Sequence, residues 1–555
     1  MKSIIKIITI LIFSLGVSFG ASYPPIKSKD GLAISSNILA NEVGQSVLEN
    51  GGNAIDAAVA VGYALAVVHP AAGNIGGGGF AVIHLANGEN ITLDFREKAP
   101  LKATRDMYLD ENGEVIKDSS VIGYLAAGVP GTVAGMSEML EKYGTKELSY
   151  LIQPAIDLAE NGFALTNRQA QTMLEVKDEF VKFNSSKKYF LKKDGSTYKE
   201  GEILVQKDLA KTLKAIQKEG KKAFYEGRIA DLIVKDMQKN GGIITKEDLK
   251  NYKPIWRKPV IGNYRGYEIV SMGAPSSGGI HIIEILNIIE NANIGELGFG
   301  SSKSVALMSE AMRQAYADRS QYLGDPDFVK VPTQKLIDKS YAKKIYNKIN
   351  PNKATSSSDI RPGLNIKESD NTTHYSIADK WGNAVSLTYT INASYGSAAA
   401  IDGAGFLLNN EMDDFSIKPG VPNIYGLIGG EANAIEANKR PLSSMSPTII
   451  LKDGKLFMVV GSPGGARIIT TVLQVISNVI DHKMDISQAV SAPRFHMQWL
   501  PDEIRIEEFG MPKDVMDNLE KLGYTIVTKP VMGDVNAILI DDNIFYGSMD
   551  PRKEF

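Results

Sequence analysis

Residues 371–392 read N-T-T-H-Y-S-I-A-D-K-W-G-N-A-V-S-L-T-Y-T-I-N, a sharply patterned stretch of a 555-residue chain. Two runs alternate between apolar and small polar residues on either side of a turn that contains Trp381 and Gly382. Such alternation predicts a β-hairpin. Because a slip of one residue exchanges the two faces of a strand, only a pairing of even with even positions keeps the polar stripes together.

That register has a chemical consequence. It sets Thr390 opposite Thr372, with roughly 5 Å between their Cβ atoms. It also leaves Gly382 for a left-handed turn position and places Asn392 just beyond the second strand. Paired threonines are ordinary in sheets, so the pair alone does not indicate a function, and the flanking sequence has to decide.

The composition excludes several classes of function. A net charge of −3 with 43% hydrophobic residues is that of a globular protein and argues against a polyanionic partner such as nucleic acid. The six histidines are scattered, and neither zinc-type spacing nor a Walker loop is present. The glycine-rich stretch 73–80 does not match a dinucleotide fingerprint and predicts close backbone packing beside a strand. We therefore expect no metal and no cofactor.

The N-terminus predicts export. Lys2 and Lys6 precede an apolar run over 7–17, and the small residues Ser18 and Gly20 follow at the −3 and −1 positions. This is typical of a secretory signal, with cleavage expected after Gly20 and an uncleaved anchor as the alternative. No later stretch approaches the ~20 apolar residues of a membrane span. The expected location is periplasmic or secreted, without a membrane anchor after removal of residues 1–20 and, since the chain has no cysteine, without disulfides.

Strands and helices are expected to alternate along most of the chain, which favours helical layers over sheet. Expected strands include 81–85, 90–96, 264–272, 405–410, 448–451 and 457–460, and expected helices include 55–68, 131–143, 281–291, 302–318 and 468–480, with a mostly helical region over 147–260. The Lys/Ser-rich segment 340–371 reads as a flexible tail, because it cannot bury enough apolar surface to order itself. A flexible tail that runs directly into Thr372 makes sense if the chain is cut at that junction.

Eight motifs, in this order, together resemble those of the γ-glutamyltranspeptidases. They are G-N-I-G-G-G-G-F, D-F-R-E, G-V-P-G, N-T-T-H-Y-S, T-Y-T-I-N, L-N-N-E-M-D-D-F, P-L-S-S-M-S-P and G-S-P-G-G. The resemblance covers nearly the whole mature chain and implies the four-layer αββα sandwich of the N-terminal-nucleophile hydrolases, an α+β fold. It also implies a single-chain precursor that cuts itself between Asn371 and Thr372 into a large subunit, 21–371, and a small subunit, 372–555.

The same resemblance implies the catalytic groups. Thr372 would be the nucleophile, and Thr390 would hydrogen-bond its hydroxyl. The backbone N–H groups of Gly464 and Gly465 would form the oxyanion hole. A threonine hydroxyl needs a base, and the cut supplies one in the α-amine of Thr372 itself, whose pKa is near 8.

A γ-glutamyl group carries a carboxylate and an ammonium on its α-carbon, so its site needs both signs of charge. By resemblance, the binding residues are a carboxylate clamp of Arg96, Ser443 and Ser444, an ammonium pocket of Asn392, Glu411 and Asp414, and a lid with Tyr425, whose hydroxyl would bond Asn392 on closing. Arginine suits the clamp because its fork binds carboxylate in a bidentate manner.

The implied activity is γ-glutamyl transfer and glutathione hydrolysis, with glutathione, other γ-glutamyl compounds and acceptor amino acids or dipeptides as small-molecule partners. One alternative is a related acylase that removes other acyl groups, such as glutaryl groups from β-lactams. It would lack the acids of the ammonium pocket and usually the lid. Another is an uncleaved binding protein of the same fold. A denaturing gel distinguishes the binding protein, since it predicts one band near 60 kDa and the enzyme predicts two.

Overall fold

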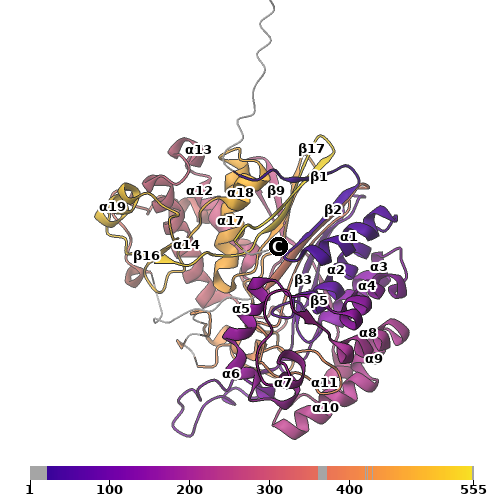
Figure 1. Cartoon of the computed structure of the whole chain (residues 1–555). Coiled ribbons are helices and arrows are strands. Elements are labelled where there is room, and N and C mark those ends of the chain that lie inside the picture. The colour runs from indigo at the N-terminus through magenta and orange to yellow at the C-terminus, as the bar shows by residue number, and fades with distance from the viewer. Residues whose placement is uncertain (1–21, 361–371, 419, 422, 428, 553–555) are drawn as a thin grey trace, which may run out of the picture.

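The computed structural model describes residues 22–360, 372–418, 420–421, 423–427 and 429–552 (Figure 1). The expected signal, 1–20, and Asn371 on one side of the expected cut lie outside these residues. Among the described residues, no helix is both long enough and apolar enough to cross a bilayer.

Two antiparallel sheets form the centre of the molecule. The six-stranded sheet runs, from edge to edge, β2 (Gly31–Ser35), β10 (Thr373–Asp379), β11 (Ala384–Thr390), β3 (Gly78–His84), β4 (Asn90–Phe95) and β7 (Ile255–Arg257). The seven-stranded sheet runs β1 (Ile26–Ser28), β18 (Ile544–Met549), β17 (Asn536–Asp541), β13 (Lys455–Gly461), β12 (Thr448–Lys452), β9 (Tyr267–Ser271) and β8 (Val260–Tyr264). Each sheet therefore combines strands from before and after residue 372.

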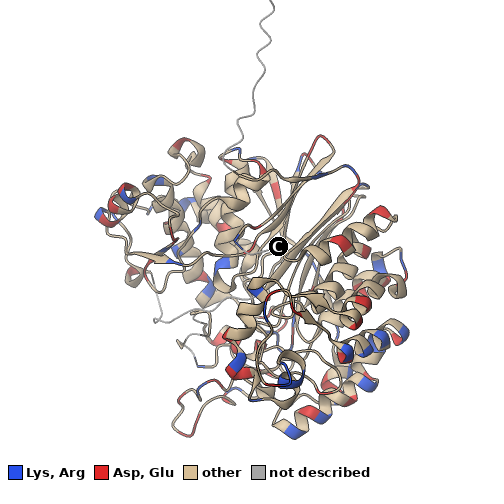
Figure 2. Ribbon diagram, viewed as in Figure 1, with Lys and Arg blue, Asp and Glu red and all other residues tan. Residues whose placement is uncertain are grey.

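Helices cover the outer face of each sheet, which gives the expected four layers (Figure 1). The six-stranded sheet packs against α1 (Ile38–Glu49), α2 (Ala54–Val68) and α3 (Thr132–Tyr143), and α4 (Leu148–Asn161) packs against the outer side of α2. The seven-stranded sheet packs against α12 (Gly278–Ile289), α17 (Ile468–Ile480) and α18 (Ile486–Ser491), and α14 (Ser302–Tyr322) and α16 (Lys339–Tyr346) pack in turn against α12. Charged residues concentrate on the helices and loops, and the central strands carry few (Figure 2).

The remaining elements lie outside this four-layer core. The region 163–251 holds β5 (Phe163–Ala164), α5 (Asn167–Glu175), α6 (Lys177–Phe180), α7 (Asn184–Phe190), β6 (Ile203–Leu204), α8 (Lys207–Glu219), α9 (Lys221–Tyr225), α10 (Arg228–Asn240) and α11 (Lys246–Asn251). Elsewhere the chain adds α13 (Ile294–Leu297), α15 (Thr333–Leu336), α19 (Lys513–Lys521) and the small sheet of β14 (Phe495–His496), β15 (Ile504–Glu507) and β16 (Ile526–Lys529). The prediction of a mostly helical region over 147–260 is thus confirmed.

Helix α2 shows how local sequence builds the core. The side chain of Asn53 accepts hydrogen bonds from the backbone of Ile55 and Asp56, and the carboxylate of Asp56 accepts one from the backbone N–H of Asn53, so the start is a capping box. Every residue of the helix is buried, which its small Ala- and Val-rich side chains permit by close packing between α1, α4 and the sheet.

The hairpin has the predicted register. His374 pairs with Thr388 and Ser376 with Ser386, and Gly382 takes a positive φ of 98° in the turn. The apolar stripe faces α2, and the polar stripe is also buried, against the second sheet. There Ser376 donates to the carbonyl of Asn536 at 2.9 Å, and Ser386 donates to that of Val460 at 3.1 Å. Hydrogen bonds between the sheets therefore add to the burial that fixes this register.

Two expectations fail. The expected strand 405–410 is not formed; a single bridge from Leu407 to Ala400 replaces it, because Gly403 and Gly405, at positive φ, turn the chain there. The flexible tail expected over 340–371 is wrong for 340–360. Helix α16 occupies its start, and Ser357 is buried, with hydrogen bonds to Arg313 and the carbonyl of Trp499. The remainder, 361–371, lies outside the described residues.

Candidate active site

Thr372 lies immediately before β10, and Thr390 ends β11 directly across the hairpin. Their hydroxyl oxygens are 3.4 Å apart, and both side chains are almost fully buried. The backbone N–H of Asn392 donates to the hydroxyl of Thr390 at 2.8 Å. Asn392 itself has a left-handed φ of 73°, which turns the chain away from the sheet at this point. The sheet thus holds the two hydroxyl groups together at its open end.

A small pocket surrounds these hydroxyl groups. Its lining includes the predicted residues Arg96, Thr372, Thr390, Asn392, Glu411, Asp414, Tyr425, Ser443, Ser444 and Gly465, together with Arg319, Leu427, Met445 and Ile468. Gly464 is the one predicted site residue that is not part of the lining. The free volume of the pocket is about 20 Å³, roughly enough for one water molecule. A substrate therefore enters only if part of the lining moves.

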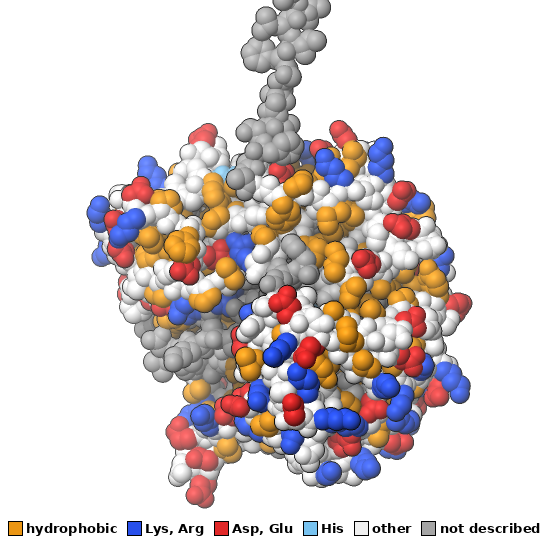
Figure 3. All heavy atoms as spheres, viewed as in Figure 1, with side chains coloured by type: hydrophobic (Ala, Val, Ile, Leu, Met, Phe, Trp, Pro, Cys, Tyr) orange, Lys and Arg blue, Asp and Glu red, His pale blue; other side chains and the backbone are white. Residues whose placement is uncertain are grey.

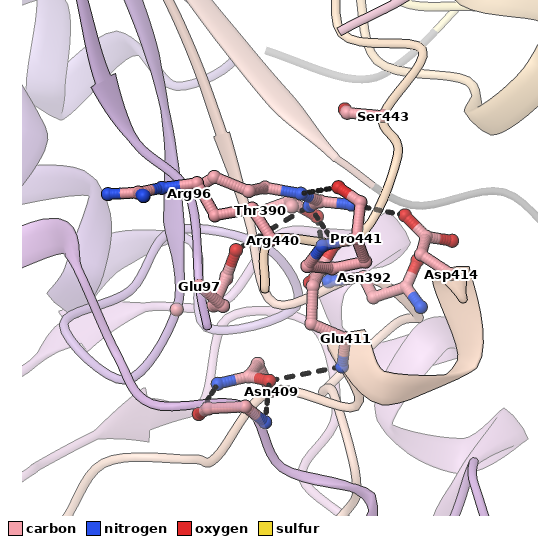
Figure 4. Close-up of polar contacts among 12 residues, drawn as sticks. Arg96, Glu97, Thr390, Asn392, Asn409, Glu411, Asp414, Arg440, Pro441 and Ser443 are labelled. Atoms are coloured by element: carbon pink, nitrogen blue, oxygen red, sulfur yellow. Dashed lines mark hydrogen bonds and ion pairs between the residues drawn. The ribbon is translucent and has the colours of Figure 1, made fainter. Parts of the chain in front are cut away.

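Arg96 is the centre of the charges in this pocket. It follows β4 directly, its side chain is fully buried, and it forms ion pairs with Glu411 and Asp414 (Figure 4). A third carboxylate, that of Glu97, lies 3.5 Å from its Nη1 atom, and its Nε donates to the carbonyl of Pro441 at 3.3 Å. Arg96, expected in the carboxylate clamp, is thus in direct contact with Glu411 and Asp414, two acids expected in a separate ammonium pocket.

These contacts shift the titration of each group. Burial alone would lower the pKa of Arg96, but Glu411, Asp414 and Glu97 together raise it. Burial raises the pKa values of Glu411 and Asp414, although Arg96 opposes the shift in both. Burial also raises the pKa of Glu97 to about 7, again opposed by Arg96. The pocket therefore holds a permanent cation and acids that are reluctant to lose their protons.

Ser443 and Ser444 lie on a loop that is fixed from outside the pocket. The backbone N–H of Ser443 donates to the carbonyl of Pro275 at 2.9 Å, and its carbonyl accepts from the N–H of Ser277 at 2.8 Å. Figure 4 shows Ser443 at some remove from the Arg96 cluster, on the loop whose Pro441 carbonyl accepts from Nε of Arg96. The two serines consequently line the pocket next to the helix start at Ser277.

Gly464 and Gly465 form the turn before α17, with φ values of 137° and 53° that favour glycine. The described hydrogen bonds give neither backbone N–H an acceptor. A Cβ atom at Gly465 would lie 2.5 Å from Cδ1 of Tyr425, so the tyrosine ring rests directly on this turn. The turn thus offers two backbone donors beneath an aromatic cover.

Tyr425 is buried over the pocket, but it does not bond Asn392 as the sequence suggested. Nδ2 of Asn392 instead donates to the carbonyl of Asn410 at 3.0 Å. The segment around Tyr425 is held by Asp413, whose carboxylate accepts from the N–H of Ile424 at 2.8 Å. Hence the contact of Tyr425 on this side of the pocket is packing against Gly465.

Sequence reasoning missed three contributors. Glu97 follows Arg96 directly, and that adjacency was its available signal. Asn409 accepts from the N–H groups of Gly128 and Glu411 at 2.8 and 3.0 Å, which joins the acid-bearing segment to a distant loop. Arg319 lies inside α14, where nothing in the sequence distinguishes it from a helix-surface arginine. In the described part of the chain, no group of three or more His, Cys, Asp or Glu side chains is arranged to hold a metal ion.

Comparisons with known proteins find relatives over most of the chain. The model of the gamma-glutamyltranspeptidase family matches residues 40–555. A glutathione hydrolase proenzyme of Escherichia coli (strain K12) is 52% identical over 542 residues, which cover 97% of this chain and 93% of that protein. A crystal structure of Helicobacter pylori gamma-glutamyltranspeptidase is 66% identical, with a TM-score of 0.61, over 61% of this chain and 97% of that one. A cephalosporin acylase from Bacillus halodurans is 25% identical, with a TM-score of 0.85, over 98% of both chains.

Proposed function

Because the chain belongs to the gamma-glutamyltranspeptidase family, we propose that it is a γ-glutamyltransferase and glutathione hydrolase. It cleaves the γ-glutamyl amide of glutathione and related compounds. The observation that carries the proposal is the hydroxyl of Thr372, 3.4 Å from that of Thr390, in a buried pocket that also contains Arg96, Glu411 and Asp414. A nucleophile and groups of both charge signs thus share one enclosed space.

The enzyme is made as a precursor and cuts itself between Asn371 and Thr372. The large subunit is 21–371 and the small subunit is 372–555. Before the cut, the nitrogen of Thr372 is an amide and cannot accept a proton. Afterwards it is an α-amine with a pKa near 8, so that a useful fraction is neutral near pH 7. The cut therefore creates the general base on the nucleophile itself, and such help is typically worth ~10²–10⁴-fold in rate.

The reaction proceeds through an acyl-enzyme. The amine takes the hydroxyl proton of Thr372 while Oγ1 forms a bond to the γ-carbonyl carbon of the donor. The resulting oxyanion accepts hydrogen bonds from the N–H groups of Gly464 and Gly465, each worth roughly 3 kcal/mol. Collapse breaks the amide bond, and the leaving amine takes back the proton. Water or the amine of an acceptor amino acid or dipeptide then attacks the ester and frees Thr372.

Binding of the γ-glutamyl group requires an exchange of partners in the Arg96 cluster. The α-carboxylate joins Arg96, Ser443 and Ser444, and the α-ammonium joins Asp414 and Glu411, with Asn392 beside them. A zwitterion carries both charges, so it inserts between the cation and the acids without leaving either unpaired. This matters because an unpaired buried charge costs several kcal/mol.

The acylase alternative rests on the close structural likeness to the cephalosporin acylase. The Arg96 cluster argues against the acylase, because a glutaryl group has no ammonium. It would leave Asp414 and Glu411 without a partner in the pocket. The alternative of an uncleaved binding protein is tested directly by the band pattern on a denaturing gel.

The mature enzyme is proposed to act outside the cytoplasm, after cleavage of the signal following Gly20. Its surface supports small-molecule substrates over a polyanion, since acidic and basic side chains are intermixed on the face seen in Figure 3. The two subunits of one precursor are its proposed protein partners.

The decisive experiment combines two measurements on the purified mature protein. N-terminal sequencing of the smaller fragment is expected to begin at Thr372, and a γ-glutamyl chromogen is expected to release its dye. Turnover by a protein whose chain is intact ahead of Thr372 would overturn the mechanism. Two fragments that are inactive on the γ-glutamyl donor but active on a glutaryl donor would favour the acylase.

A further inference from the structure

A second buried guanidinium, that of Arg319, lines the pocket without an acidic partner. Its side chain is 4% exposed, and among the described residues it forms hydrogen bonds but no ion pair. Arg96 contrasts with it, since three carboxylates surround that guanidinium. So does Arg313, six residues earlier in α14, which is buried but pairs with Asp502. Asp414 is the nearby acid that acts on the charge of Arg319, but no carboxylate of the described residues contacts that guanidinium directly. A buried charge without a direct partner is costly, which indicates a place for an anion beside Arg319.

The two hydrogen bonds of Arg319 both end on serine hydroxyl groups. Its Nε donates to Oγ of Ser277 at 3.0 Å, and its Nη2 donates to Oγ of Ser444 at 3.3 Å. A guanidinium can only donate, so each of these hydroxyl groups must direct its own hydrogen elsewhere. Ser277 donates its hydrogen to the carbonyl of Ser443 at 2.8 Å. Arg319 thereby fixes the loop of the two pocket serines from behind.

The same logic sets the direction of the hydroxyl groups inside the pocket. Ser444 accepts from Arg319 and can turn its hydrogen toward the pocket. Oγ of Ser443 accepts from the N–H of Met445 at 3.1 Å and is left as a donor in the same way. A carboxylate only accepts hydrogen bonds, so two serines held as donors match it.

We propose that Arg319 is a positioning residue for the α-carboxylate of the substrate. It orients Ser444 directly and Ser443 through Ser277, and it supplies a second positive charge beside Arg96. This inference rests on the proposed function, because it takes the γ-glutamyl group as the ligand of the pocket.

The protonation of Arg319 is consistent with this role. Burial lowers its pKa to about 10, and the neighbouring charge of Asp414 opposes the shift. The group thus stays charged at neutral pH. A new anion next to Arg319 would offset the free-energy cost of burying its charge. Only ligands that carry a carboxylate at this position therefore gain binding free energy from it.

The test compares two competitive inhibitors of a chromogenic γ-glutamyl donor. L-glutamate carries the α-carboxylate, and 4-aminobutyrate is the same chain without it. In Arg319→Gln, the Ki of L-glutamate is expected to rise about tenfold, as for the loss of one charge-assisted contact. The Ki of 4-aminobutyrate should stay within about twofold of the parent. Equal changes in both constants would reduce Arg319 to a structural role and overturn the inference.

Three further variants keep the test decisive if Arg319→Gln is not processed. Arg319→Lys keeps the charge but cannot reach both serines, and Ser277→Ala removes one acceptor of Arg319 together with the donor to the carbonyl of Ser443. Both are expected to shift the ratio of the two Ki values in the same direction, by about threefold. Arg313→Gln removes an equally buried arginine of the same helix and should leave the ratio unchanged.

Failure of this inference is separable from failure of the proposed function. A parent enzyme that turns over γ-glutamyl donors, with variants that keep the parent's Ki ratio, would overturn the role of Arg319 alone. A correctly cut parent that does not turn over γ-glutamyl donors would overturn the proposed function and this inference with it.

Discussion

The hydroxyl oxygen of Thr390 lies 3.4 Å from that of Thr372, across the open end of one hairpin. Thr390 also accepts the backbone N–H of Asn392, so one hydroxyl links the proposed nucleophile to the turn behind it. Both sheet faces beneath this pair are buried, which leaves the two side chains little freedom to separate.

This link predicts different outcomes for two substitutions of Thr390. Thr390→Ser keeps the hydroxyl and should remain within about threefold of the parent kcat, whereas Thr390→Val leaves the N–H of Asn392 without its acceptor, a loss of about 1–3 kcal/mol. We expect Thr390→Val to lower kcat at least about tenfold in whatever fraction is cut. Steady-state kinetics on a γ-glutamyl chromogen checks this, with Thr372→Ala as the uncut, inactive reference. Equal kcat values for the valine and serine variants would remove Thr390 from the mechanism.

Arg96→Lys is expected to raise KM for γ-glutamyl donors roughly 10–100-fold, because lysine cannot reproduce the bidentate fork that a carboxylate fits. The same change weakens the contacts to Glu411 and Asp414, so thermal unfolding should be followed beside the kinetics. Arg105→Lys is a suitable control, since Arg105 pairs with an acid on the surface. An unchanged KM in Arg96→Lys would show that the pocket does not bind the carboxylate through this residue.

Gly465→Ala should displace Tyr425, because the added methyl group would lie 2.5 Å from its ring. It also strains a backbone φ of 53°, which costs roughly 1–2 kcal/mol on its own. Gly454→Ala separates the two effects, since its φ is 74° and an added Cβ meets no atom within 4 Å. We expect both variants to lose some thermal stability and Gly465→Ala alone to lose most of its kcat. Comparable activity in the two would mean that the contact with Tyr425 is unimportant.

Asp413 predicts a pH effect on stability. Burial raises its pKa to about 7, although bonds from Ile424 and Ser120 oppose the shift. Between about pH 4 and pH 7 the folded protein binds this proton and the unfolded chain does not, so stability falls as pH rises through that window. Asp413→Asn cannot titrate, so its unfolding temperature should fall less over that window. The free-energy difference approaches about 1.4 kcal/mol per pH unit. Parallel curves for parent and variant, measured in a Thr372→Ala background, would contradict this.

The hairpin and the site loops could be predicted because alternation and motif order are local properties of the sequence. The register followed from parity together with the turn at Trp381 and Gly382, and the structure agrees with it pair by pair. Arg319 could not be predicted, since its role depends on two serines that reach it from other segments. The direct contact of Arg96 with Glu411 likewise joins positions 315 residues apart, which no local pattern reports. Order in 340–360 was missed because packing against distant groups such as Trp499 stabilises a segment that is polar on its own.

The edge of the seven-stranded sheet shows where the two ends of the chain can be joined. There β1 pairs with β18, with Ile26 opposite Gly547, so the two ends of the described chain run side by side. A short linker from Arg552 to Ser22 would let a circular permutant begin at Thr372. Removal of its initiator methionine would expose the free threonine amine. Such a chain would therefore mature without autocatalytic cleavage of its backbone.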